Sequence, residues 1–276
     1  MSTKKTNSPP PPPESLNLPL TGVDSHAHLD LHHFGNDLEE VLQSARRAGV
    51  ERIGNVFLSL EAWEKGKEFF ATCPEVFFLL GIHPTDAMHY SPAVRQGFIR
   101  AFAEDSRIRA LGEIGLDFYW KDCPPDTQKA AFIDQLHLAR ELKRPIVIHC
   151  RDAYAETTAI LRDEGFHGYP VLWHCFGGTR DEAQYLVDAG WHISIPGPVT
   201  FPTNHALRAA LAVIPPDKLL TETDCPYLAP MPYRGKRNQP AYTVFTITCM
   251  ADTLGVPPSE LWKRCGDNAK AFFGLD

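Results

Sequence analysis

The chain has 276 residues, of which 43% are hydrophobic and 22% charged, a composition that supplies enough apolar side chains for one large buried core. Its formal net charge of −7 argues against a broad, charge-driven grip on nucleic acid, although bound metal ions can still hold a phosphate locally. Seven cysteines without a Cys-x-x-Cys pair favour a reduced, cytoplasmic protein, and no apolar run approaches the ~20 residues of a membrane span.

Residues 1–20 are polar and include five consecutive prolines at positions 9–13, so we expect a disordered, proline-rich leader. Over residues 21–276, short apolar runs alternate with amphipathic stretches, which predicts one domain. Strands are expected from residue 23 and at 52–57, 76–82, 108–116, 145–149, 171–174, 191–195 and 218–223. Helices are expected at 37–48, 60–70, 91–104, 127–143, 153–164, 179–189, 204–212, 241–254 and 258–273.

This alternation predicts the α/β class and, within it, a single (β/α)₈ TIM barrel with additional C-terminal helices. A doubly wound open sheet is the alternative, but no glycine-rich dinucleotide turn follows the first strand. In a barrel the C-terminal ends of all strands meet at one mouth, where functional residues lie.

The predicted strand ends carry side chains that bind metal ions. His26 and His28 close the first strand, and because side chains alternate along a strand, both point to the same side. Two such histidines by themselves are equally well read as surface residues. The later strand ends add His83, Glu113, His149, His174 and Asp224. A lone histidine is more often structural than ligating, but this whole set at one mouth predicts a metal site.

Seven short motifs run along the chain in a fixed order. They are DSHAH (24–28), GIHP (81–84), GEIGLD (112–117), IHCR (148–151), HCFGG (174–178), ETDCP (222–226) and RGKRN (234–238). In these motifs the chain resembles the TatD family of metal-dependent hydrolases and deoxyribonucleases, which are amidohydrolase-type barrels. The resemblance covers residues 23–276 and leaves only the leader outside.

The resemblance implies a centre with two divalent metal ions. The implied ligands are His26, His28 and Asp224 for the first ion, His149 and His174 for the second, and Glu113 as a bridge between both. Asp224 would also take the proton of the attacking water, so Asp224 and Glu113 are the expected catalytic residues. Imidazoles with two carboxylates suit Zn²⁺, Mn²⁺, Fe²⁺ or Ni²⁺ better than Mg²⁺, although members of the family are often described as magnesium-dependent.

Further residues near the predicted mouth are expected to contact the substrate. We read His83 as a contact to a substrate phosphate. The segment 229–238 is either a solvated basic loop or a lid that binds phosphates and stacks on a base. The lid residues would be Arg234, Lys236, Arg237 and Tyr233. Residues 118–120, Phe-Tyr-Trp, are either a second platform for bases or packing beneath a loop.

Other residues next to the implied ligands are expected to support them. Asp117 and Arg151 either orient the ligands or form a simple loop salt bridge. Each of Cys150, Cys175 and Cys225 directly follows an implied ligand. Since strand alternation turns neighbouring side chains to opposite faces, we expect all three thiols in the layer between barrel and helices, as small buried hydrophobes.

The function that these features favour is a metal-dependent phosphodiesterase, specifically a 3′–5′ exodeoxyribonuclease acting on DNA or RNA ends. A D-aminoacyl-tRNA deacylase or another esterase is the alternative, because the same ligand set would activate water against a carbonyl. A catalytically silent binding protein would require a lost ligand, and none is lost. We therefore expect a nucleic-acid end or a nucleotide-like substrate as partner, no membrane, and a monomer without an obligate protein partner.

Overall fold

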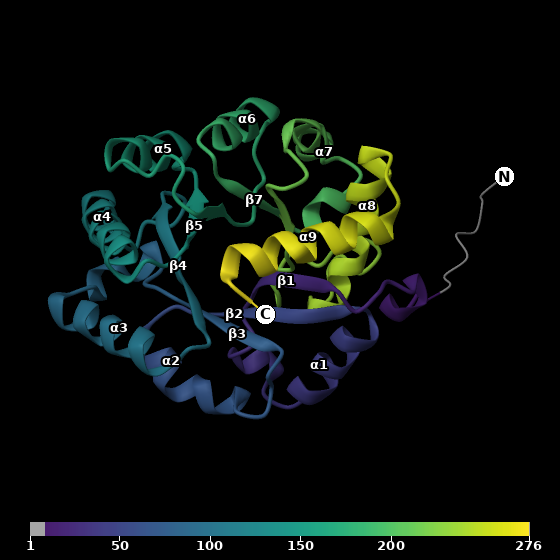
Figure 1. The fold of residues 1–276 in the computed structure, drawn as a ribbon, viewed down its shortest axis with the longest axis horizontal. Coiled ribbons are helices and arrows are strands. Elements are labelled where there is room, and N and C mark those ends of the chain that lie inside the picture. The colour runs from purple at the N-terminus through teal and green to yellow at the C-terminus, as the bar shows by residue number, and fades with distance from the viewer. Residues whose placement is uncertain (1–8, 276) are drawn as a thin grey trace.

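The predicted barrel is confirmed. The structure, a computed structural model, describes residues 9–275. Eight parallel strands are hydrogen-bonded in sequence order, and helices lie around them (Figure 1). A parallel bridge between Ala27 of the first strand and Cys225, just beyond the last strand, brings the two edges of the sheet together. The strands are β1 (Gly22–Ala27), β2 (Val50–Phe57), β3 (Val76–Leu80), β4 (Ile108–Asp117), β5 (Ile146–Arg151), β6 (Val171–Trp173), β7 (His192–Ile195) and β8 (Leu219–Thr221).

Helices surround the strands, and one of them crosses an end of the barrel. They are α1 (Leu38–Arg47), α2 (Leu60–Gly66), α3 (Pro92–Glu104), α4 (Pro125–Leu142), α5 (Tyr154–Asp163), α6 (Arg180–Asp188), α7 (His205–Ala210), α8 (Thr243–Leu254) and α9 (Pro258–Phe273). The helix expected at 60–70 is instead α2 followed by the 3₁₀ helix Lys67–Phe70. Among residues 9–275 no helix is both long and apolar enough to span a membrane.

The interior of the barrel is filled by apolar side chains from the strands. Val147, Leu172 and Leu220 lie in one buried cluster with Phe272 and Phe273 of α9, which closes this end. Because strand side chains alternate, the next inward positions along β5 and beyond β6 and β8 are His149, His174 and Glu222. Packing at one end therefore leaves the polar side chains grouped at the other end.

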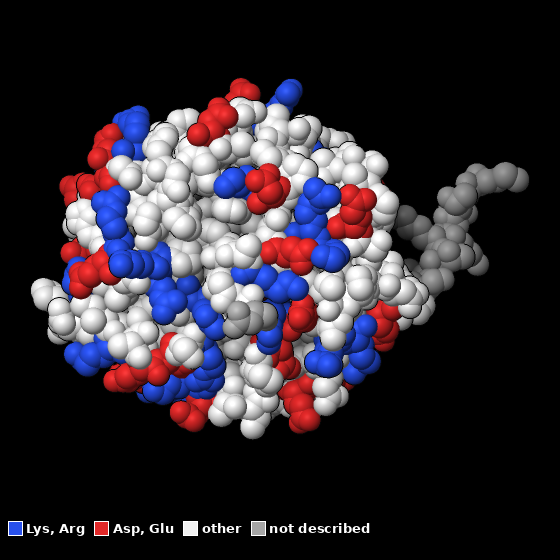
Figure 2. Space-filling model, viewed as in Figure 1, with Lys and Arg blue, Asp and Glu red and all other residues white. Residues whose placement is uncertain are grey.

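The face crossed by α9 carries both positive and negative side chains. Lys and Arg side chains are interspersed there with Asp and Glu (Figure 2). Several of these charges are paired within one helix, as in the ion pair between Arg264 and Glu260 at 3.2 Å. The net charge of −7 is thus not concentrated on this side of the molecule.

The N-terminal stretch requires a correction. Residues 1–8 of the expected disordered leader lie outside the described residues, but the rest of the leader packs on the barrel. Pro13–Leu16 form a 3₁₀ helix in which Pro13 is buried. The indole N–H of Trp262 donates to the carbonyl of Pro19 at 2.8 Å. The folded domain therefore begins before residue 21, because apolar side chains and exposed carbonyls of this stretch find partners on the barrel.

Candidate metal centre

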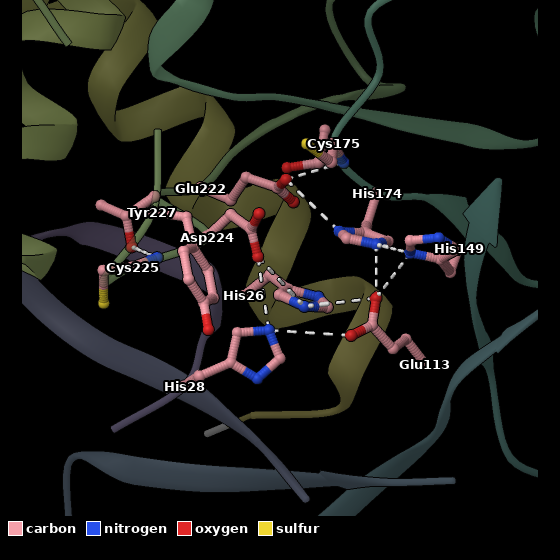
Figure 3. A network of polar contacts seen from close by, with 12 residues as sticks. His26, His28, Glu113, His149, His174, Cys175, Glu222, Asp224, Cys225 and Tyr227 are labelled. Atoms are coloured by element: carbon pink, nitrogen blue, oxygen red, sulfur yellow. Dashed lines mark hydrogen bonds and ion pairs between the residues drawn. The ribbon is translucent and has the colours of Figure 1, made fainter. Parts of the chain in front are cut away.

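The implied metal ligands converge at the C-terminal ends of the strands (Figure 3). They come from β1 and its end, β4, β5 and the residues just after β6 and β8. The residues concerned are His26, His28, Glu113, His149, His174 and Asp224. Segments almost two hundred residues apart in sequence therefore contribute to one cluster, as expected for the mouth of a barrel.

The first half of the centre consists of His26, His28 and Asp224, whose ligand atoms all lie within 4.8 Å of one another. Asp224 Oδ1 is 3.3 Å from Nε2 of His28 and 3.8 Å from Nε2 of His26. Both ring nitrogens of His26 are buried and have no hydrogen-bond partner among the described residues. Since a buried polar atom without a partner is costly, the His26 ring fits a site completed by a metal ion.

The second half consists of His149 and His174, which share a carboxylate oxygen of Glu113. Oε2 of Glu113 lies 2.6 Å from Nε2 of His174 and 3.2 Å from Nδ1 of His149. Its other oxygen, Oε1, lies 3.7 Å from Nε2 of His28 in the first half. One buried carboxylate therefore faces both groups of imidazoles, which is the position that a bridging ligand requires.

In the second half, the carboxylates and the imidazoles stabilise one another's charged forms. Burial by itself would raise the pKa of Glu113, but His174 and His26 hold that pKa well below its usual range. Burial by itself would lower the pKa of His174, but Glu113 and Glu222 hold it well above the usual value. Since a metal cation would bind the same nitrogen, we expect a proton and a metal ion to compete for His174.

Each imidazole of the second half also has a carboxylate near its other nitrogen, and the one beside His149 forms a hydrogen bond. Oδ2 of Asp117 lies 3.0 Å from Nε2 of His149, as predicted for a residue that orients a ligand. Oε1 of Glu222 lies 3.5 Å from Nδ1 of His174 and accepts the backbone N–H of Cys175 at 2.7 Å. Carboxylates in this position leave one defined nitrogen of each ring for a metal ion.

Glu222 was not among the predicted site residues. Its signal in the sequence is its spacing of two from Asp224, which places both side chains on one face of an extended segment. Together with Glu113 and Asp117, these residues supply four carboxylates, enough to balance two divalent cations in a buried site. The donor set therefore fits two divalent metal ions.

His83 lies beside the second half, with its ring centroid 4.3 Å from that of His149. Burial and the neighbouring His149 lower the pKa of His83 to about 3. Its Nδ1 accepts the backbone N–H of Thr85 at 3.3 Å, so the neutral ring carries its proton on Nε2. His83 is therefore a neutral hydrogen-bond donor next to the metal ligands.

Two of the predicted lid residues have other partners. The guanidinium of Arg237 pairs with Asp37 at 2.6 Å and donates to the carbonyl of His33. Tyr233 stacks on Tyr242 with centroids 4.1 Å apart, and its hydroxyl donates to the carbonyl of Pro11. These contacts argue against the substrate roles expected for Arg237 and Tyr233, which instead anchor the loop to α1 and to the N-terminal stretch.

The other two lid residues remain at the surface. Arg234 and Lys236 are both exposed. The guanidinium of Arg234 lies 4.3 Å from the ring centroid of Phe201. Tyr227, which sequence reasoning missed, is 52% exposed at the edge of the first half, with its ring centroid 6.3 Å from that of His28.

Two of the three cysteines that follow implied ligands lie between the barrel and the helices, as expected, and the third does not. Cys225 is completely buried, and Cys150 accepts a hydrogen bond from Thr157 of α5 at 3.5 Å. Cys175 differs, because its sulfur lies within 4.8 Å of ligand atoms of His174 and Glu222. The strand alternation used for the prediction ends at Trp173, and Cys175 has a φ of +49°, so its side chain turns back toward the site.

Comparison with known proteins identifies the family. Residues 23–274 match the family described as TatD related DNase. The chain belongs to the TatD family of metal-dependent hydrolases. It is 37% identical over 257 residues to the uncharacterized metal-dependent hydrolase YcfH of Escherichia coli K12, covering 92% of this chain and 96% of that protein.

Two further TatD proteins extend this comparison. The chain is 34% identical over 260 residues to the 3′-5′ ssDNA/RNA exonuclease TatD of Klebsiella pneumoniae, with coverage of 92% and 98%. The crystal structure of the TatD homologue YjjV from Escherichia coli superposes with a TM-score of 0.87 at 25% identity, covering 93% and 99% of the two chains. The shared barrel spans nearly the whole of each protein.

Proposed function

We propose that this TatD protein is an exonuclease that shortens DNA or RNA strands from the 3′ end. The observation that carries the proposal is the position of Glu113, one buried carboxylate that faces two separate groups of imidazoles. Such an arrangement suits two metal ions, which together favour phosphodiester hydrolysis. The name of the Klebsiella relative, at 34% identity, supports the same substrate class.

The six implied ligands form two groups, one for each ion. His26, His28 and Asp224 would hold one ion and His149 and His174 the other, with Glu113 shared. Ions held there would activate a water molecule and stabilise the charge that develops on phosphorus.

Asp224 would take the proton of that water. Burial alone would raise its pKa, but His28 lowers it, and its side chain is 16% exposed toward the mouth. The N–H of His83 at Nε2 would donate to a substrate phosphate oxygen. Arg234 and Lys236 would bind further phosphates of the strand.

The direct test uses a single-stranded oligonucleotide labelled at its 5′ end. The metal-loaded enzyme is expected to yield a ladder of strands shortened from the 3′ end. Asp224→Asn is expected to lower turnover at least about 100-fold, the usual contribution of a general base. Release of amino acid from D-aminoacyl-tRNA without any shortening of the oligonucleotide would favour the esterase alternative instead.

Two observations would contradict an enzyme that engages strand ends. The first is cleavage of closed circular DNA, which has no end. The second is a steep dependence of affinity on salt, because an enzyme that contacts few phosphates releases few counterions.

A further inference from the structure

Two aromatic side chains next to the metal centre are unusually exposed. Tyr119 and Trp120, just after β4, have exposed fractions of 49% and 50%. Their neighbour Phe118 packs against the hydrophobic core, so packing beneath the loop accounts for Phe118 alone. The other tryptophans of the chain are at most 3% exposed. The exposure of Trp120 is therefore a local feature of this loop.

One carboxylate joins these aromatic residues to a metal ligand. Oδ1 of Asp117 accepts the backbone N–H groups of Tyr119 and Trp120 at 2.9 and 3.0 Å. The other oxygen of the same side chain, Oδ2, lies 3.0 Å from Nε2 of His149. The backbone that carries the two rings is consequently fixed beside the second half of the metal centre.

The loop is also held at both of its ends. The buried Gln128 accepts the backbone N–H of Asp117 at 2.9 Å and donates to the carbonyl of Cys123 at 3.0 Å. A loop fixed in this way loses little conformational entropy when a ligand binds to it. The exposed rings therefore form a preformed surface.

The charges around the two rings suit a polyanion. The guanidinium of Arg151, at the end of β5, lies 3.7 Å from the ring centroid of Tyr119 and 5.9 Å from that of Trp120. Arg151 and Lys121 are both exposed. Aromatic rings interleaved with cations are the surface on which bases of single strands stack while their phosphates are bound.

We propose that Tyr119, Trp120 and Arg151 form a platform on which an unpaired base of the substrate strand stacks. This inference rests on the proposed exonuclease function and deepens it. A base that is paired in a duplex has its faces covered by its neighbours, whereas an unpaired terminal base is free to stack. The platform therefore selects single-stranded ends next to the metal centre.

Trp120 supplies a direct readout, because it is the exposed tryptophan of the chain. The probe is a single-stranded phosphorothioate oligonucleotide, which resists cleavage, added to the metal-loaded protein. We expect quenching of the exposed tryptophan emission by this strand. We expect about 10-fold weaker binding for a strand of equal length whose terminal nucleotides are abasic, the loss of one stacked base.

Variants separate stacking from general effects of the substitution. By anisotropy of a labelled strand, Trp120→Ala is expected to weaken binding about 10-fold, whereas Trp120→Phe keeps a ring and most of the affinity. Phe69→Ala is the matched control, because Phe69 is 68% exposed and lies in the 3₁₀ helix before β3. Its affinity is expected to equal that of the wild type.

The outcomes distinguish the platform from the proposed function. Quenching that depends on bases, without any shortening of cleavable strands, would support the platform and remove the exonuclease proposal. Shortening by an enzyme whose Trp120→Ala variant binds normal and abasic strands equally well would remove the platform and keep the exonuclease. If the wild-type protein binds neither strand, the platform is overturned.

Discussion

The two halves of the metal centre are built differently. In the second half, His149 and His174 each have a carboxylate facing the nitrogen that is turned away from Glu113. In the first half, both nitrogens of His26 lack a hydrogen-bond partner among the described residues, and Asp224 faces both imidazoles. Asp117 therefore orients the His149 ring before any ion binds, and Glu222 contacts the His174 ring at 3.5 Å without a hydrogen bond. Neither nitrogen of His26 has a carboxylate this close.

This difference predicts unequal binding of the two ions. A carboxylate behind a ligating imidazole fixes the ring and makes it a stronger donor. We therefore expect the second half to bind its ion more tightly than the first.

Removing the carboxylate that both halves share should impair metal binding in both of them. Glu113→Gln keeps the size of the side chain but loses the charge that faces both groups of imidazoles. We expect loss of both ions and a fall in turnover of about 1,000-fold, equivalent to about 4 kcal/mol. Metal analysis of the folded variant, checked by circular dichroism, measures the first effect. Two ions retained at a near-normal rate would contradict the assignment.

Removing the carboxylates beside His149 and His174 should bring the metal affinity of the second half closer to that of the first. Glu222→Gln and Asp117→Asn are each expected to weaken binding of the second ion about 10- to 100-fold, the usual cost of losing such a partner. Affinity for the first ion should not change in either variant. Competition with a chelator measures both affinities, and equal losses in the two halves would argue against separate sites.

Low pH should weaken the binding of a metal ion to the second half in particular. The pKa of His174 lies well above its usual value because Glu113 and Glu222 outweigh the effect of burial. Binding of the second ion must therefore release a proton at neutral pH, and affinity should rise as the pH rises. Calorimetry in buffers of different ionisation enthalpy measures this proton. An affinity independent of pH between about 6 and 8 would contradict the expected competition.

A carboxyl group beneath the first half affects the pH dependence of stability, by a small amount per pH unit. Asp24 Oδ2 contacts the hydroxyl of Thr223 at 2.5 Å rather than an imidazole, and burial raises the pKa of Asp24 to about 8. A folded-state pKa above the unfolded value contributes stability that is present at low pH and is lost as pH rises toward 8. Asp24→Asn should remove this loss, which approaches about 1.4 kcal/mol per pH unit.

The measurement is denaturant unfolding of both metal-free proteins across this pH range. The amide oxygen of asparagine can still accept the backbone N–H of Thr223, so the fold should be kept. Identical slopes of stability against pH in the two proteins would show that Asp24 is ionised when folded.

The strands and helices could be predicted because a parallel barrel imposes a regular alternation of apolar runs and amphipathic helices. The ends of the elements were less predictable. β6 ends at Trp173 and β8 at Thr221, so His174 and Asp224 lie beyond the regular ladders. Positive φ angles at Cys175 and Asp224 are tolerated because neighbouring contacts hold these residues. The prediction made from the alternation of strand side chains was therefore wrong at Cys175.

The grouping of the implied ligands could be anticipated because their positions at strand ends are visible along the sequence. The contact of Glu222 with His174 and the pairing of Arg237 with Asp37 could not, because each partner is brought near only by folding. Arg237 pairs with Asp37, which precedes it by 200 residues. A basic residue in a loop carries no local signal that tells such an anchor from a phosphate contact.

Calorimetric titration of the metal-free protein with Mn²⁺ tests the two-ion centre most directly. The wild type should bind two ions per chain with different affinities. His174→Ala should lose the tighter event and His26→Ala the weaker one, each leaving a folded protein with one ion. A single ion per chain, or a tighter event that survives His174→Ala unchanged, would contradict the division of the site into two halves.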